Sequence, residues 1–300
     1  FLYNYFANLL RAVGNSVTPL LFLGLSVVLN IGLDLLFVIP LSMGVMGAAL
    51  ATVTAQYIAA LGLLLYTWHA FPELRVRRED CRWNKAVLKS LLNLSLFTCL
   101  QQSVMNFGIL MIQGLVNSFG TAVMAAFAVA VKIDTIAYMP VQDFGNAFST
   151  FVAQNYGAGR RDRIGKGVRW AVFWVVLFCL VIGGLVCLLA PQLMGVFVGA
   201  ENTQVIAIGV GYLRIEGAFY LGIGILFLLY GYFRAVDRPA VSVVLTVCSL
   251  GTRVLLAYTL SPLPALGVTA IWMAIPIGWF FADAVGILLW RRESRRGAPG

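Results

Sequence analysis

Four oxygen-bearing side chains lie at similar depths in the first three apolar segments of the chain. At ~1.5 Å per helical residue, Asp34 lies about 9 Å from the end of its segment at Pro40, and Asn30 lies one turn deeper on the same face. The same counting places Thr52 and Asn4, on the neighbouring segments, about 12 and 16 Å deep. Such oxygens coordinate hard monovalent cations, and a lone carboxylate can instead take a proton. The spacing therefore predicts a Na⁺ or H⁺ site, with interhelical hydrogen bonding alone as the alternative.

A stripe of amide side chains runs along the apolar segment 87–115. Gln102, Asn106, Gln113 and Asn117 fall within an arc of about 60° on a helix at ~100° per residue, and Gln101 lies beside them. A stripe this narrow faces either the interior of a lobe or a wet cleft. We expect Gln101, Gln102 and Asn106 to contribute to a substrate cleft.

Five further ionisable residues lie within apolar segments of the second half of the chain. They are Lys132, Asp134, Arg214, Glu216 and Arg253. An ionisable group at membrane depth costs at least ~2.5 kcal/mol, so each needs a partner or a function. One interpretation is a buried network in which Arg253 and Lys132 neutralise the two acids. The other is that one acid is left under-compensated and attracts cationic cargo.

The composition indicates which kind of molecule positions these groups. Of the 300 residues, 61% are hydrophobic and 11% are charged, and the mean hydropathy is +0.90. Soluble domains carry roughly a quarter charged residues, so soluble enzymes are excluded and an all-α polytopic membrane protein is expected. The sequence contains no H-E-x-x-H or paired-cysteine motif, so we expect no metal and no cofactor other than the coupling ion.

Apolar runs of ~20 residues predict the membrane spans. The chain offers the end of one helix and eight whole spans: 1–13, 17–39, 45–68, 87–115, 120–155, 168–198, 205–233, 240–260 and 266–290. We expect Pro140 to kink the long segment 120–155.

The basic residues predict the orientation of these spans. Of the 21 Lys and Arg residues, 18 fall in alternate loops, and the remaining loops carry none. This asymmetry assigns the basic loops and the C-terminus to the cytoplasm and explains the net charge of +9 without a nucleic-acid partner. Asp283, near the cytoplasmic end of the last span, is expected to be a snorkelling or capping group.

An internal repeat relates the two ends of the chain. The tripeptide Arg-Ala-Val occurs at 11–13 and at 234–236, and Gly-Val occurs at 44–45 and at 267–268, with the same offset of 223 residues. Internal repeats in polytopic membrane proteins are typical of transporters built from two similar lobes around a central site.

The repeat also shows where the two copies differ in chemistry. At the same offset, Arg253 takes the place of Asn30, and Ala257 takes the place of Asp34. A fixed guanidinium then stands where a cation ligand would be needed. We therefore expect the cation site in the first copy only.

Longer motifs carry a resemblance to a known family. RAVGNSVTP, LNIGLDLLF, GVMGAALATV and FGTAVMAAFAVAVKIDTIAYMPVQDFGNAFSTFVAQNYGAG resemble the multidrug and toxic compound extrusion (MATE) family. The resemblance implies a pseudo-symmetric bundle of two six-helix lobes, of which roughly the first three helices precede Phe1. Residues 1–68 would be helices 4–6, 69–86 the inter-lobe loop, 87–290 helices 7–12, and 291–300 a cytoplasmic tail.

The resemblance also implies a function. Family members export diverse, often cationic compounds in exchange for Na⁺ or H⁺, and several hold the ion in the first lobe. Asn4, Asn30, Asp34 and Thr52 match the family's ligand positions on helices 4, 5 and 6. We therefore expect a monomeric antiporter of the bacterial inner or plasma membrane, with small-molecule drugs, toxic metabolites and membrane lipids as its partners.

The alternative functions are different uses of a membrane helix bundle. The first is a lipid-linked or polysaccharide flippase, which would need Lys132, Arg214 and Arg253 to line a cationic cavity. The others are a membrane-embedded enzyme, for which no nucleophile–base pair is visible, and a non-transporting scaffold.

Overall fold

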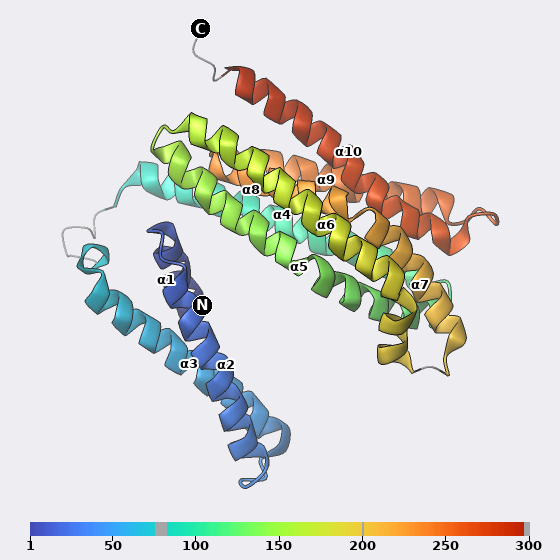
Figure 1. Cartoon of the computed structure of the whole chain (residues 1–300), viewed down its shortest axis with the longest axis horizontal. Coiled ribbons are helices and arrows are strands. Elements are labelled where there is room, and N and C mark those ends of the chain that lie inside the picture. The colour runs from blue at the N-terminus through green and yellow to red at the C-terminus, as the bar shows by residue number, and fades with distance from the viewer. Residues whose placement is uncertain (76–82, 200, 297–300) are drawn as a thin grey trace. The chain divides into compact units, whose positions relative to one another are not determined.

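The computed structural model describes residues 1–75, 83–199 and 201–296, and every regular element in these ranges is a helix (Figure 1). The chain divides into two compact units, Phe1–Asn84 and Lys85–Gly300. Parts of the predicted inter-lobe loop and cytoplasmic tail, at 76–82 and 297–300, lie outside the described residues.

The described part of the first unit contains three α-helices and a short 3-10 turn. They are α1 (Leu2–Ala12), α2 (Val17–Val38), α3 (Gly44–Ala70) and η1 (Pro72–Leu74). Buried alanines at four-residue intervals, Ala51, Ala55 and Ala59, give α3 a flat face on which neighbouring helices can pack closely. Contacts between α1, α2 and α3 hold together the three helices that carry Asn4, Asn30, Asp34 and Thr52.

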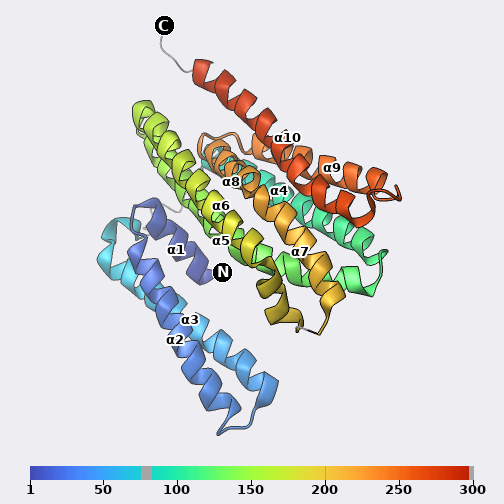
Figure 2. The same ribbon diagram turned by 45° about the vertical axis from the view of Figure 1, so that its right-hand side comes forward.

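The described part of the second unit contains seven helices. They are α4 (Lys85–Asn117), α5 (Thr121–Gly157), α6 (Arg161–Val198), α7 (Thr203–Ala218), α8 (Tyr220–Ala235), α9 (Pro239–Leu260) and α10 (Gly267–Arg296). The helix pairs α9–α10, α5–α8, α6–α7 and α4–α9 make extensive contacts. In both views α9 and α10 run side by side (Figures 1 and 2).

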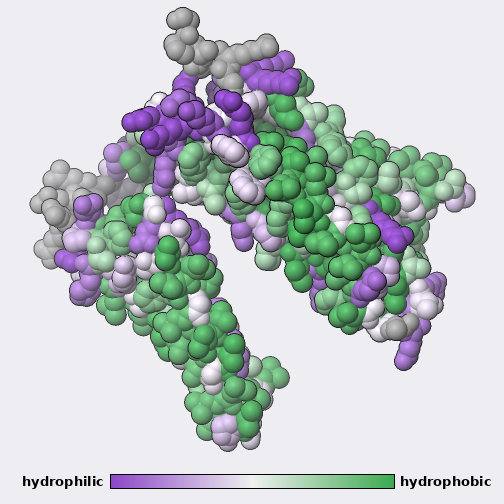
Figure 3. All heavy atoms as spheres, in the orientation of Figure 1, coloured by the Kyte–Doolittle hydropathy of each residue, from purple (hydrophilic) through white to green (hydrophobic). Residues whose placement is uncertain are grey.

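Within the described ranges, seven helices are long and apolar enough to cross a membrane, or eight if the bent pair α7–α8 counts as one span. Apolar side chains cover much of the visible surface, and hydrophilic side chains gather around the α5–α6 turn and the C-terminal part of α10 (Figure 3). Among the exposed apolar residues are Leu20, Val28, Leu188 and Val196. The chain is therefore a multi-pass membrane protein whose outer surface suits lipid.

The predicted segment 205–233 contains a break that its apolar pattern does not indicate. Helices α7 and α8 meet at Phe219 with a bend of 53°. At the break the amides of Phe219 and Gly222 bond to carbonyl oxygens three residues back, to Glu216 and Phe219, instead of four. By contrast, α5 continues through Pro140 without interruption.

The internal repeat is also a repeat of helix boundaries. Helix α3 begins at Gly44 and α10 begins at Gly267, which lies 223 residues later. The preceding helices begin at Val17 and Pro239, within one residue of the same offset. The register read from the sequence is therefore the register of the folded chain.

The turns that follow Arg11 and Arg234 share a backbone conformation. Gly14 has a φ of 90°, and Asp237, at the equivalent position, has a φ of 59°. The same hydrogen bond of 2.9 Å closes each turn, from the Asn15 amide to the Leu10 carbonyl and from the Arg238 amide to the Phe233 carbonyl. This six-residue closure is a helix C-terminal motif, which favours glycine at the left-handed position.

Candidate functional site

The first unit brings two of the four predicted cation ligands into contact. Asn30 on α2 donates a hydrogen bond of 3.3 Å from Nδ2 to Oγ1 of Thr52 on α3. Thr52 Oγ1 in turn donates to the carbonyl of Ala48, 3.0 Å away on its own helix. The contact between α2 and α3 thus fixes Thr52 with its hydroxyl oxygen beside the Asn30 amide.

Asp34 lies one turn beyond Asn30 on α2. Its side chain is half-buried, and its Oδ1 atom is buried with no hydrogen-bond partner among the described residues. A carboxylate in this position is unstable in a membrane unless it holds a proton, binds a cation or finds a donor. The site therefore has an acid with unused coordinating capacity.

Asn4 is the least connected of the four. It is exposed on α1 and lines a cavity of about 370 Å³ together with Phe1, Tyr5, Asn8 and Leu9. No hydrogen bond in the described part of the chain joins Asn4 or Asp34 to the other ligands. Of the four predicted ligands, only Asn30 and Thr52 are directly bonded.

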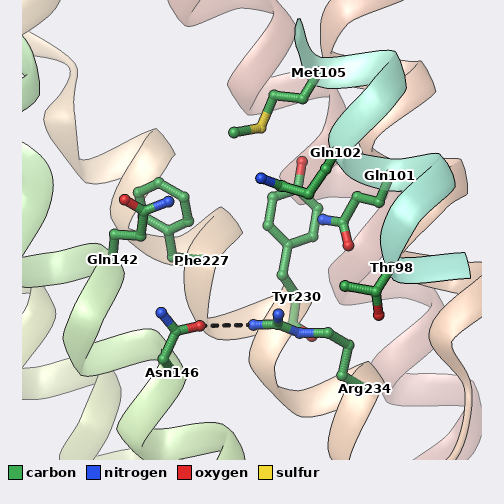
Figure 4. Close-up of a pocket in the computed structure, with 9 residues that line it drawn as sticks. All are labelled: Thr98, Gln101, Gln102, Met105, Gln142, Asn146, Phe227, Tyr230 and Arg234. Carbon is green, nitrogen blue, oxygen red and sulfur yellow. Dashed lines mark hydrogen bonds between the residues drawn. The ribbon is translucent and has the colours of Figure 1, made fainter. Parts of the chain in front are cut away.

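A polar pocket lies in the second unit between α4, α5 and α8 (Figure 4). It has a volume of about 70 Å³ and is lined by Thr98, Gln101, Gln102, Met105, Gln142, Asn146, Phe227, Tyr230 and Arg234. Gln101 and Gln102, predicted for a substrate cleft, both line it. Asn106 does not line this pocket; it is exposed elsewhere on α4.

Arg234 forms one wall of this pocket. Its Nη2 donates a hydrogen bond of 3.0 Å to Oδ1 of Asn146 on α5, and its Nε donates to the Tyr230 carbonyl at 3.3 Å. The two helices can approach because Gly145 and Gly231 face each other where α5 and α8 cross. A side chain at either glycine would push Arg234 away from Asn146.

The far half of the amide stripe on α4 is paired within its own helix. Gln113 donates a hydrogen bond of 3.2 Å from Nε2 to Oδ1 of Asn117. These two side chains therefore satisfy each other at the end of α4. The amides of α4 that line the polar pocket are Gln102, from the stripe, and Gln101 beside it.

A separate buried cluster surrounds Asp134 on α5, which is 4% exposed. Its carboxylate accepts a hydrogen bond of 3.2 Å from the hydroxyl of Tyr212 on α7 and a second, short one from the hydroxyl of Tyr220 on α8. Two phenol donors therefore replace the water that the carboxylate loses on burial.

Glu216 and Arg253 complete this cluster. Glu216 is fully buried, and neither carboxylate oxygen has a hydrogen-bond partner among the residues that the structure describes. Arg253 on α9 is half-buried and attracts both Asp134 and Glu216 electrostatically, without a direct ion pair. Lys132, predicted as a second neutralising cation, is instead exposed and forms no ion pair within the described ranges.

Two groups of this site were missed from the sequence, and an acid outside it, Asp283, was misplaced. Tyr212 and Tyr220 lie four residues on either side of Glu216, a spacing that marks one helix face and could have indicated them. Asp283 is not a snorkelling group, because it is 4% exposed and both carboxylate oxygens lack partners among the described residues. It packs near Gly222 on α8 inside the bundle.

Comparisons with known proteins agree on one family. Residues 95–259 match the family model described as MatE. The "Probable multidrug resistance protein YpnP" of Bacillus subtilis is 32% identical over 96% of this chain and 64% of its own length. The "FAD transporter" of Shewanella oneidensis is 23% identical over 89% of this chain and 60% of its own.

The fold has a close match among solved structures. A MOP superfamily transporter from Pyrococcus furiosus superposes with a TM-score of 0.90 at 24% identity, over 97% of this chain and 65% of its own. At this identity the match shows the fold alone. The chain spans less than two thirds of the length of each of these relatives.

Proposed function

The chain belongs to the MATE family of membrane transporters, and from this premise we propose that it exports organic compounds in exchange for Na⁺ or H⁺ bound at Asp34. Asn30, Thr52 and Asn4 would supply further oxygen ligands. Cargo would bind at the amide face of α4 that includes Gln102, with Asn106 on the same helix, and the exported compounds would be drug-like molecules or toxic metabolites.

The observation that carries this proposal is the buried Asp34 Oδ1 atom, which has no hydrogen-bond partner among the described residues and lies one helical turn from Asn30, itself bonded to Thr52. Glu216 and Asp283 also lack partners among the described residues, but Asp34 lies one helical turn from an amide that is bonded to a hydroxyl of the next helix. An acid that exchanges a bound cation must leave coordinating capacity free. Binding of the ion would then favour one of two conformations through its different affinity for each.

The flippase alternative has less support. It requires Lys132, Arg214 and Arg253 to line a common cavity, but none of them lines the polar pocket between α4, α5 and α8.

The test is efflux of ethidium from proteoliposomes under an imposed Na⁺ or H⁺ gradient. We expect Asp34→Asn to reduce gradient-driven efflux to the level of empty vesicles while insertion remains normal. Asp162→Asn, the same isosteric change at an exposed acid in the first turn of α6, is the control and should retain full efflux. Undiminished gradient-driven efflux by the Asp34 variant would remove the proposed coupling site.

A further inference from the structure

The pocket between α4, α5 and α8 contains one cation and no acid. Arg234 is the only charged side chain among the residues that line it, and no described carboxylate lies within ion-pair distance of its guanidinium. Arg238, four residues later, shows the contrast, because it is exposed and pairs with Glu293 at 3.1 Å. The pocket thus has a net positive charge that no acid among the described residues pairs with.

Neutral amides surround this charge. Gln101 and Gln102 reach the pocket from α4, and Gln142 reaches it from α5. Figure 4 shows their amide groups directed into the space beside the Arg234–Asn146 pair. An amide can donate N–H bonds, and two of the five N–H donors of the Arg234 guanidinium are occupied by Asn146 and the Tyr230 carbonyl. The remaining donors suit a ligand that brings several acceptor oxygens.

The size of the pocket limits what enters it. A volume of about 70 Å³ is well below the ~300 Å³ of the smallest drug-sized pockets. It can hold one functional group of a larger molecule. Gln102 and Asn146 are exposed, so the pocket is open to the surface and the rest of the ligand can extend outward.

The internal repeat distinguishes a binding role of Arg234 from a role in orienting a membrane span. Arg11 occupies the position equivalent to Arg234, yet it is exposed and bonds to Asn8 on its own helix at 3.2 Å. A positive charge at the helix end is enough to orient a span, and Arg11 supplies it from an exposed side chain. The half-burial of Arg234 against Asn146 on another helix needs a different explanation.

We propose that this pocket binds a phosphate or carboxylate group, held by the Arg234 guanidinium and the surrounding amides. Arg–oxyanion pairs of this kind are charge-assisted and can be bidentate. The anion belongs either to a transported compound or to the headgroup of an anionic lipid. The inference rests on the proposed function only in treating the pocket as part of a cargo path, because anion binding is measurable without transport.

The experiment compares two dyes that share a xanthene ring system and differ in charge. Fluorescein is anionic and rhodamine 6G is cationic, and fluorescence anisotropy gives the Kd of each for the purified protein in phosphatidylcholine nanodiscs without an ion gradient. We expect Arg234→Gln to weaken fluorescein binding about tenfold or more, the loss typical of a charge-assisted hydrogen bond. Its Kd for rhodamine 6G should not rise.

The control is Arg238→Gln, which removes the same charge from an exposed residue outside the pocket. It should leave the Kd of fluorescein unchanged. An unchanged Kd in the Arg234 variant, or an equal loss in both variants, overturns the proposal. Since no gradient is applied, this outcome is independent of whether Asp34→Asn abolishes efflux.

A second variant keeps the test valid if Arg234→Gln does not fold. Gln102→Glu introduces a carboxylate at an exposed wall of the pocket. It should weaken fluorescein binding and tighten rhodamine 6G binding, and an unchanged Kd for fluorescein would overturn the proposal.

The source of the anion is distinguished by adding phosphatidylglycerol to the nanodiscs. Competition by this lipid that is seen in the unaltered protein and lost in Arg234→Gln assigns the pocket to an anionic headgroup. If the lipid affects both proteins equally, through the surface charge alone, the pocket is assigned to a soluble anion.

Discussion

Gly145 on α5 and Gly231 on α8 approach so closely that a Cβ atom on Gly231 would lie 2.5 Å from the carbonyl oxygen of Gly145. The contact is between two backbones, so no side-chain rotation can relieve it. The crossing lies next to the polar pocket. Two residues that line the pocket are close to it in the chain, because Asn146 directly follows Gly145 and Arg234 lies one turn after Gly231.

We predict that Gly231→Ala destabilises the second unit by about 1–3 kcal/mol, the usual effect of overpacking. Gly251→Ala on α9 is the matched control, because no atom lies within 4 Å of its Cβ position. That change should be neutral or raise stability by about 0.5–1 kcal/mol through helix propensity. Thermal unfolding in detergent, followed by tryptophan fluorescence, measures both. Equal melting temperatures for the two variants would contradict the close approach.

Tyr220→Phe should destabilise the protein by about 1–3 kcal/mol, because buried Asp134 loses one of its two hydroxyl donors. Tyr57→Phe removes a hydroxyl from a tyrosine that is 64% exposed and should change stability little. The comparison uses the same unfolding measurement. A Tyr220 variant as stable as the Tyr57 variant would show that the hydroxyl does not support the carboxylate.

Opposite substitutions at the two equivalent turns should have opposite effects. Gly14→Ala places a Cβ in a left-handed conformation and should cost about 1 kcal/mol, whereas Asp237→Gly removes one and should raise stability by a smaller amount. Circular dichroism during heating gives both shifts in melting temperature. Shifts of the same sign would mean that the two turns differ in conformation.

Thr52→Val should raise the ion concentration for half-maximal efflux about tenfold, because it replaces a predicted oxygen ligand with a methyl group of similar size. It also removes the acceptor of the Asn30 hydrogen bond. Thr54→Val, on the same helix two residues away, is the control. The measurement is ethidium efflux over a range of Na⁺ concentrations and of pH. Equal ion dependence in the two variants would exclude Thr52 as a ligand.

Much of the architecture can be predicted from local patterns of the sequence. The apolar runs located the spans, and the repeated Arg-Ala-Val and Gly-Val pairs gave a register that the helix starts at Gly44 and Gly267 reproduce. These features are predictable because they depend on the length of the apolar runs and on the chain's own periodicity.

The break at Phe219 depends on contacts that a local pattern does not contain. Gly217 lies against Gly183 on α6, and Tyr220 reaches Asp134, which is 86 residues away in the chain. The run from 205 to 233 contains no proline, and its two charged residues, Arg214 and Glu216, both precede the break, so its apolar pattern favours a continuous helix. Only the folded bundle shows what holds the two halves of this span at an angle.

Site residues were harder to predict than spans for a related reason. In the sequence, Arg234 is one of several cations in the loops. Its place in a pocket follows from the close approach of α5 and α8 at their glycines, which brings Asn146 beside it. Asp283 read as a residue near the membrane surface, although distance along a helix does not tell which side of the helix is covered. Counting along a helix gives a position relative to its ends, whereas enclosure depends on which neighbouring helices cover that position.

The matched turns after Arg11 and Arg234 have a practical consequence. Both turns share one conformation and one closing hydrogen bond, so they should be interchangeable. A chimera carrying residues 11–15 at positions 234–238 should therefore retain the turn between α8 and α9. The membrane-embedded side chains on either side of these corners are not exchangeable, since one copy carries Asn30 where the other carries Arg253. The two copies of the repeat therefore share the conformation of these turns, whereas their membrane-embedded side chains differ in chemistry.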